Sequence, residues 1–387
     1  SRTAHVLLAD VLVNLGRYAE AAAILEQFKT GMDDGTARDL PMRSYAELVE
    51  GKLADKQGNL DQAIKIFAAV MDNKAYPGKI RDLGRLALAR AEIVREKNNP
   101  EQAEEETRAQ PQEEEAPHTA GTAEERLLAF IGGKSESSLL MDAFNILLEE
   151  DIFRTNPQAL EKLTGWVNAR DAGRQPAAMY AMGSLLLAKD DLAGAVKMAE
   201  DGLSKYPQSL PVQTLSLNTI TTLLDKNRVE DAERLISKYP GTSPGLVFQQ
   251  GALAFRKGDY PLAQSLFREA ARRASEKTAE SALFNENLAA LNANDAAGAA
   301  ALVKEAAGSA QLREHILFEQ AHYAAKRMNP QAPELLASFV ALATDPALKT
   351  QARLDQAEVA LNLNPPDLET VQAILPPLEL SLIHISE

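Results

Sequence analysis

Three side chains near the end of the chain have the types and spacing of a possible metal site. His315, Glu319 and His322 lie at i, i+4 and i+7, a spacing that brings two of them to one face of a helix, where a divalent cation could contact both. The other histidines, which could supply further ligands, are remote in sequence: His5, His118 and His384. The sequence therefore favours a partly exposed polar helix face and predicts no metal site.

A second candidate is the segment Phe130-Ile-Gly-Gly-Lys-Ser135, which ends like a phosphate-binding loop. Such a loop needs a glycine five residues before Gly133, and Leu128 occupies that position. An ordinary turn between helices explains the segment better, so we expect no nucleotide cofactor. The chain also has no cysteine, which excludes thiol nucleophiles. We predict no catalytic residue and no enzyme activity.

The composition is that of a folded, helix-rich protein. Of the 387 residues, 45% are hydrophobic, 25% are charged and 5% are aromatic, and alternating β-branched runs are rare. The formal net charge of −14 and the lack of a basic stripe argue against a nucleic-acid partner. No apolar run is long enough to insert into a membrane.

A pattern of glycine, corner residue and alanine repeats along the chain. In each copy a Gly is followed two residues later by Tyr or Leu, five residues later by Ala, and then by a large apolar residue. The copies are Gly16-Arg-Tyr-Ala-Glu-Ala21 with Leu25, Gly58-Asn-Leu-Asp-Gln-Ala63 with Phe67, and Gly258-Asp-Tyr-Pro-Leu-Ala263 with Phe267. The Gly ends one helix in a left-handed conformation, and the Ala lets an antiparallel partner approach closely. Each copy therefore predicts a helical hairpin.

These hairpins resemble the tetratricopeptide repeat family at the residues that define it, including a small residue seven positions before the turn, as at Gly51, Gly183 and Gly251. The resemblance implies an all-α fold, a right-handed superhelix (α-solenoid) of stacked antiparallel helix pairs, and a repeat of about 34 residues. Weaker copies place Asp190, Asn227 and Asn294 at the turn. Further helix pairs are expected at 311–343 and 347–379.

Composition changes along the chain predict its organisation. Residues 1–108 form an N-terminal repeat block, and the Glu- and Pro-rich residues 109–122 form an acidic, mobile linker. Residues 123–175 are helical but do not match the repeat, and Trp166 within them has the spacing of a core residue. Residues 176–379 form the C-terminal repeat block, and residues 380–387 look non-native.

We call the position seven residues before each turn the small site. In the repeat family, the residues three and two positions before the small site face the concave groove. The first of these positions gives the apolar row, Tyr180, Leu217, Phe248 and Phe284, which Phe318 extends in a less certain register. The second gives the amide row, Asn218, Gln249 and Asn285, with Ala181 and Glu319 at the equivalent positions. Apolar pockets beside amides suit an extended peptide, but an error of one or two residues in register would place the same side chains in the core between repeats.

The sequence thus predicts a non-catalytic scaffold or adaptor, of bacterial type, that binds a protein or peptide partner in its groove. Two alternatives stay open: an envelope-assembly or polymer-export module of a larger membrane-anchored protein, and the regulatory arm of a larger enzyme. The composition fits the bacterial cytoplasm or periplasm, and we favour the periplasm because truncation at the N-terminus would remove an export signal.

Overall fold

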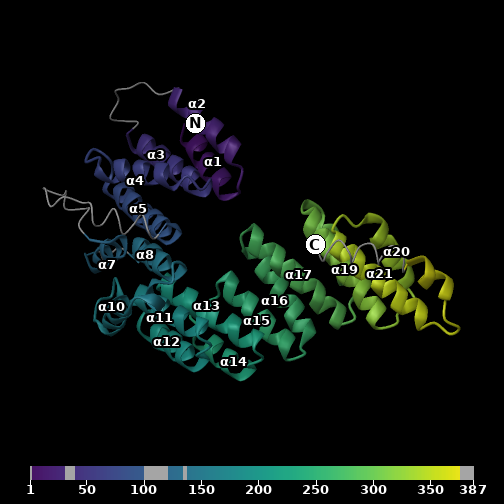
Figure 1. Cartoon of the computed structure of the whole chain (residues 1–387). Helices are drawn as coiled ribbons and strands as arrows, with labels where there is room; N and C mark the ends of the chain where they lie inside the picture. Colours follow the sequence, from purple (N-terminus) through teal and green to yellow (C-terminus); the bar gives the residue numbers. More distant parts are fainter. Residues whose placement is uncertain (1, 31–39, 100–120, 134–136, 375–387) are drawn as a thin grey trace. The chain divides into compact units, whose positions relative to one another are not determined.

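The computed structural model of the chain describes residues 2–30, 40–99, 121–133 and 137–374, and this part of the chain is helical throughout, without a β-strand. Within each described stretch, most consecutive helices are joined by short turns (Figure 1). The chain divides into two compact units, unit 1 (Ser1–Val212) and unit 2 (Gln213–Glu387). The all-α class predicted from the sequence is confirmed.

Unit 1 contains the first helices of the chain. They are α1 (Arg2–Asn14), α2 (Tyr18–Thr30), α3 (Leu40–Lys56), α4 (Leu60–Asp72), α5 (Gly78–Asn98), α7 (Ala123–Gly133), α8 (Ser137–Glu149), α9 (Ile152–Thr155), α10 (Pro157–Asn168), α11 (Gln175–Ala188) and α12 (Leu192–Lys205). Neighbouring helices such as α1 and α2 or α3 and α4 pack against each other as hairpins.

Unit 2 continues the same arrangement. Its helices are α13 (Leu210–Asp225), which begins at the end of unit 1, α14 (Val229–Lys238), α15 (Pro244–Arg256), α16 (Tyr260–Arg273), α17 (Glu276–Asn292), α18 (Ala296–Glu305), the short 3-10 helix η1 (Ala306–Gly308), α19 (Ala310–Lys326), α20 (Ala332–Leu342) and α21 (Pro346–Leu361). Residues 368–374 are also helical. The predicted pair at 311–343 corresponds to α19 and α20.

The turns of the helix pairs share one backbone geometry. Gly16, Gly58 and Gly258 have φ values of 74°, 79° and 78°. In each turn the left-handed residue donates its N–H to the carbonyl three residues earlier, and the next N–H donates to the carbonyl five residues earlier, which satisfies the last carbonyls of the helix. The same φ sign and the same two bonds occur without glycine at Asp190, Asn227, Asn294 and Met328. The register predicted at the first three of these is therefore confirmed, and Met328 adds a turn that its side chain did not suggest.

The residue after the turn frequently caps the second helix of the pair. The side chains of Asn59, Asp191, Asp259 and Asp295 each accept a hydrogen bond from the backbone N–H three residues later. Such caps satisfy N–H groups that have no partner within the helix and favour its start at a fixed residue. The turn and the cap together fix where each hairpin bends.

The small site and a large residue on the second helix fit together. A Cβ atom added at Gly51 would clash with the ring of Phe67, and one added at Gly251 would lie 2.9 Å from Cδ1 and Cε1 of Phe267. Both rings are buried, with at most 2% exposed. The glycines are thus required for close helix approach, as the sequence pattern predicts.

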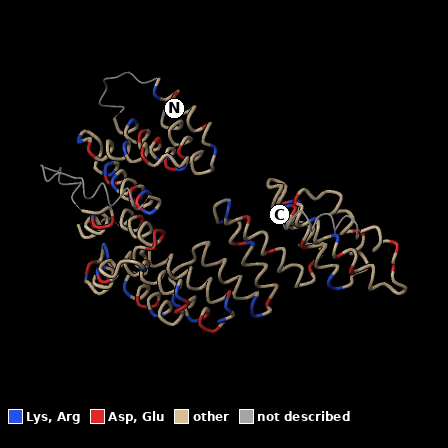
Figure 2. The backbone as a smooth tube through the Cα atoms, in the orientation of Figure 1, with Lys and Arg blue, Asp and Glu red and all other residues tan. Residues whose placement is uncertain are grey.

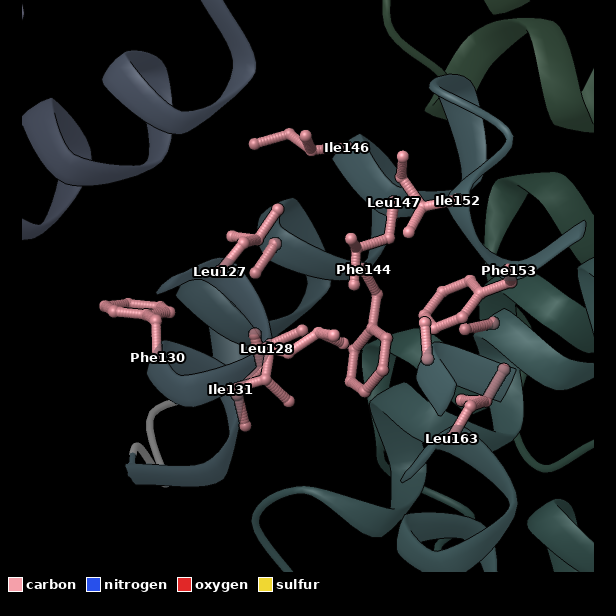
Figure 3. Packing of buried hydrophobic residues seen from close by; sticks show 14 of the residues in the cluster. Leu127, Leu128, Phe130, Ile131, Phe144, Ile146, Leu147, Ile152, Phe153 and Leu163 are labelled. Carbon is pink, nitrogen blue, oxygen red and sulfur yellow. The ribbon is translucent and has the colours of Figure 1, made fainter. Parts of the chain in front are cut away.

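The non-matching segment 123–175 forms a large part of the core of unit 1. Figure 3 shows Phe144, Phe153 and Leu163 directed toward the same interior, together with residues of α7 and α8. The ring of Trp166 is partly buried and meets that of Phe144 edge-on at 5.7 Å, so it packs against this core. The cluster continues onto α5 and α11 through Ile93 and Leu185, so α7–α10 are packed between regular repeat helices.

The predicted domain boundaries stay predictions. Most of the acidic linker, residues 109–120, and the tail 380–387 lie outside the described residues. By contacts, the chain divides instead within α13.

Candidate functional site

The apolar row is only partly buried, and its members also pack between helices. The ring of Phe248 lies edge-on to Phe267 at 5.3 Å, and Leu217 reaches the start of α15, where a Cβ on Gly245 would lie 3.1 Å from its Cδ1. Phe318 is 7% exposed. Tyr180 belongs to unit 1, where burial raises the pKa of its hydroxyl, an effect that a hydrogen bond with Ser184 opposes. The row therefore contributes both to the core and to an accessible face.

The amide row varies much more from repeat to repeat. Asn218 is exposed. Gln249 is 9% exposed and donates from Nε2 to Oγ1 of Thr221 on the preceding first helix, α13, at 2.8 Å. Asn285 donates from Nδ2 to the carbonyl of Ser281 within its own helix, at 2.8 Å. Only Gln249 is therefore held by a neighbouring repeat.

The residue that follows the small site in the preceding repeat explains this difference. Thr221 occupies that position for Gln249, and His322 occupies it for Asp355, whose Oδ2 lies 2.6 Å from the His322 Nδ1. Ala252 and Leu288 occupy it for Asn285 and Glu319 and offer no hydrogen-bonding group. Gln249 and Asp355 are thus bonded to the preceding repeat, whereas no such bond holds Asn285, whose neighbour is Ala252.

A pocket of about 340 Å³ lies between α17 and the start of α19, beside Asn285, which has no hydrogen bond to a neighbouring repeat. Two predicted site residues, Phe284 and Asn285, line it together with His315, which the sequence offered only as a possible metal ligand. The other lining residues were not singled out from the sequence: Lys277, Glu280, Ser281, Ser309, Gln311 and Leu312. His315 meets the Phe284 ring edge-on at 6.4 Å. Most of the missed residues come from helix starts, which the register of the small site does not mark.

The histidine and carboxylate cluster at the end of unit 2 is a set of hydrogen bonds and stacked rings. Asp355 is 1% exposed and accepts from Gln351 as well as facing His322, and the His322 ring stacks on Phe318. Burial raises the pKa of the Glu319 carboxyl. Among the described residues, no group of three or more His, Asp or Glu side chains has the arrangement of a metal site.

Two polar residues of α17 are fully buried. Glu286 is fully buried, and its Oε1 accepts from Nε of Arg268 at 2.8 Å, while its Oε2 is buried without a hydrogen bond. Asn287 occupies the small site, is fully buried and accepts from Nε2 of Gln320. The repeat register places Asn287 at the small site, whereas only the three-dimensional packing shows that Glu286 is buried.

A serine motif in unit 2 has a structural role. Gly241-Thr-Ser-Pro-Gly245 has the spacing of the turn that exposes a nucleophilic serine in hydrolases. Ser243 instead caps α15, and its hydroxyl accepts from the N–H of Leu246 at 3.2 Å. The segment follows α14 and a bend rather than a strand, so the geometry is that of a helix cap. Lys134 and Ser135 of the other motif lie outside the described residues.

Charges of both signs are distributed along the described helices. Figure 2 shows Lys and Arg residues interspersed with Asp and Glu residues in both units. Among the described helices, none is long and apolar enough to cross a bilayer.

Comparison with known proteins gives a family match at the N-terminus. Residues 3–29, which correspond to α1, the Gly16 turn and α2, match the family described as Tetratricopeptide repeat. No curated protein sequence matches the chain.

Several solved structures resemble the chain at low sequence identity. The APC/C hetero-tetramer Cut9-Hcn1 has 12% identity, a TM-score of 0.28, and coverage of 97% of this chain and 84% of that chain. The human IFIT1 dimer with m7Gppp-AAAA has 11% identity, a TM-score of 0.36, and coverage of 100% and 91%. Yeast Tom70 has 11% identity, a TM-score of 0.34, and coverage of 92% and 95%.

Tetratricopeptide repeats generally mediate protein–protein interactions. The matched hairpin and the turn geometry that recurs through the described residues agree with each other. Residues 3–29 of the chain therefore form a tetratricopeptide repeat, and the turn geometry of that hairpin recurs in the described helix pairs that follow.

Proposed function

We propose that the chain is a non-catalytic scaffold that binds an extended peptide segment of a partner protein. The peptide lies on the face of unit 2 that is formed by the first helix of each helix pair. The binding face comprises the six row residues of that unit: Leu217, Asn218, Phe248, Gln249, Phe284 and Asn285. Tyr180 stays a prediction for unit 1.

The observation that carries the proposal is the pocket between α17 and α19. It combines the ring of Phe284 with the amide of Asn285, and that amide is not tied to a neighbouring repeat. Asn285 can redirect its Nδ2 from the Ser281 carbonyl at small cost, because the carbonyls of a helix interior already accept a backbone hydrogen bond. Its amide can then donate to and accept from a peptide group.

An extended chain also suits the spacing of the rows. Its backbone carries one donor and one acceptor per residue, and its side chains project alternately to opposite sides. A face that offers amides beside half-buried apolar side chains can therefore bind the backbone and accept every second side chain. Gln249 contributes shape rather than hydrogen bonds, since Thr221 already holds it.

The proposal is tested by selecting ligands from a random peptide library displayed on phage and measuring their affinities. For a selected peptide, the Asn218→Ala/Asn285→Ala double variant is expected to bind about tenfold more weakly, from the loss of one or two net hydrogen bonds. The matched control is Asn292→Ala, since Asn292 lies on the same helix and also donates to a carbonyl four residues earlier, at 2.8 Å. Unchanged affinity with unchanged helicity would remove the amide row from the mechanism.

A further inference from the structure

The α17/α19 pocket has one apolar side and one polar rim. Phe284 and the 8%-exposed Leu312 provide the apolar surface, and His315 stands edge-on to the Phe284 ring at 6.4 Å. Hydroxyl, amide and charged groups surround them: Ser281, Ser309, Asn285, Gln311, Lys277 and Glu280. A flat ring placed beside Phe284 and His315 would gain apolar burial and edge-to-face contacts, which aromatic rings prefer.

One helical turn beyond His315, the carboxylate of Glu319 lacks a partner of opposite charge. It is partly buried, and it forms no hydrogen bond or ion pair with the described residues; its electrostatic neighbours are His322, His315 and Asp355. Asp355 occupies the equivalent position in the next repeat and contacts His322 of the preceding one. For Glu319, the corresponding residue of the preceding repeat is Leu288, which cannot form a hydrogen bond through its side chain. A partly desolvated carboxylate of this kind is stabilised by a cationic donor.

We infer that this pocket selects a partner segment in which an aromatic side chain lies next to a Lys or Arg. The inference rests on the proposed function and specifies its ligand. The ring occupies the space between Phe284, Leu312 and His315, and the basic group pairs with Glu319. Lys277 and Glu280 lie at the other end of the pocket, at the start of α17, so the basic residue is expected on the Glu319 side of the ring.

Charge supports this occupant over an acidic one. Glu280 lines the pocket, Glu319 lies one helical turn beyond the lining residue His315 on α19, and the chain as a whole has a net charge of −14. An acidic segment would place a carboxylate near Glu319, and like charges at short range repel. A segment with an aromatic and a basic residue meets both parts of the site.

The test compares the sequences that a displayed random peptide library yields with different variants as bait. The wild-type chain is expected to enrich peptides with Phe, Tyr or Trp adjacent to Lys or Arg. With Glu319→Gln, the aromatic preference should remain, and the affinity advantage of a basic over a neutral neighbour should fall by about tenfold, the effect of losing one charge-assisted bond. The matched control Glu334→Gln changes an exposed carboxylate on α20 and should leave the preference intact.

The ring contact is tested in the same selection with Phe284→Leu, which keeps an apolar side chain of similar size while removing the ring. Its thermal unfolding is measured in parallel to show that it folds. This variant should lose the preference for aromatic over aliphatic residues. Enriched peptides without the aromatic and basic pair, or with acidic residues, overturn this inference and leave the proposed function standing. Failure of the wild-type chain to enrich any sequence overturns both.

Discussion

Two neighbouring helix pairs of unit 2, α15–α16 and α17–α18, occupy the same place in the repeat and are built differently. In the first pair, Gly251 packs on the buried ring of Phe267, and Gln249 is bonded to Thr221. In the second, the small site holds the buried Asn287, Glu286 is buried beside it, and Asn285 has no bond to a neighbouring repeat. The first pair is an ordinary close-packed hairpin, while the second contains buried polar groups and borders the pocket.

The comparison shows that one repeat register can serve packing or recognition. Buried polar groups cost free energy unless they are hydrogen-bonded, and Glu286 and Asn287 each retain a buried atom without a partner. A helix pair that is less well satisfied internally is a reasonable place for a ligand site. Substitutions on the two pairs should therefore affect stability and binding in opposite proportions.

The largest effect is expected at Arg268, which neutralises Glu286 between α16 and α17. The Arg268 side chain is 43% exposed while the Glu286 side chain is fully buried. Arg268→Met should lower the free energy of unfolding by about 2–3 kcal/mol at neutral pH, because it leaves a buried carboxylate without its cation. The loss should shrink in acid, where Glu286 can take up a proton. Urea unfolding at two pH values measures this.

The matched control for Arg268 is Lys257→Met, which removes a cation from an exposed ion pair with Glu233. Surface pairs contribute about 0–1 kcal/mol, so this control should change the stability little. Equal losses in the two variants would contradict the view that α17 depends on a buried charge.

The small sites of the two pairs should respond differently to alanine. Gly251→Ala forces a Cβ toward Phe267 and should destabilise the chain by about 1–3 kcal/mol, a cost that the additional substitution Phe267→Leu should reduce. Asn287→Ala removes a buried amide whose Nδ2 has no hydrogen bond and whose Oδ1 accepts from Gln320. Because the Gln320 Nε2 also donates to the carbonyl of Ala299, the substitution should cost less than about 1 kcal/mol. A double-mutant cycle in thermal unfolding tests the Gly251–Phe267 coupling, and additive costs would argue against it.

A hydrogen bond between neighbouring repeats can be removed at Gln249 and introduced at Asn285. Thr221→Val keeps the side-chain shape but leaves the Nε2 of Gln249 without its acceptor, which should cost about 1 kcal/mol. Ala252→Thr provides an acceptor for Asn285 and should stabilise the chain by a few tenths of a kcal/mol while weakening the binding of a selected peptide. Stronger peptide binding by Ala252→Thr would contradict the role assigned to the free amide.

The smallest effect concerns the pH dependence of Glu319. Burial raises its folded pKa above the ordinary value of about 4.3, so the folded state binds the proton more tightly than the unfolded state. The resulting stabilisation is present below the unfolded pKa and is lost as the pH rises through the folded pKa. The free energy of unfolding of Glu319→Gln should therefore be slightly higher than that of wild type at neutral pH. The difference should be less than about 1 kcal/mol, because exposure screens the charge. The difference should vanish near pH 4, and a peptide with a basic residue should reduce it.

The sequence predicts the hairpins well because their turns depend on local chemistry. Gly16, Gly58 and Gly258 adopt left-handed conformations readily, and Asp190, Asn227 and Asn294 tolerate them. Met328 could not be predicted, since nothing in its side chain favours positive φ. Its turn is imposed by the packing of α19 and α20.

The candidate site is less predictable because it depends on residues of different repeats. Gln249 and Asn285 are equivalent in the repeat register, yet only Gln249 has a Thr on the preceding first helix to bind it. The division of Phe248 and Phe284 between core and pocket likewise follows from their neighbours, Phe267 for one and His315 for the other. Register groups equivalent side chains into rows, and their three-dimensional neighbours determine which of them remain available.

The most direct test of the proposed binding face is a crystal structure of the chain with its tightest selected peptide. The account predicts an extended peptide across α17 and α19, with its backbone bonded to the amide of Asn285 and a side chain between Phe284 and Leu312. A peptide bound elsewhere, with Asn285 still donating to Ser281 and the pocket unfilled, would contradict it.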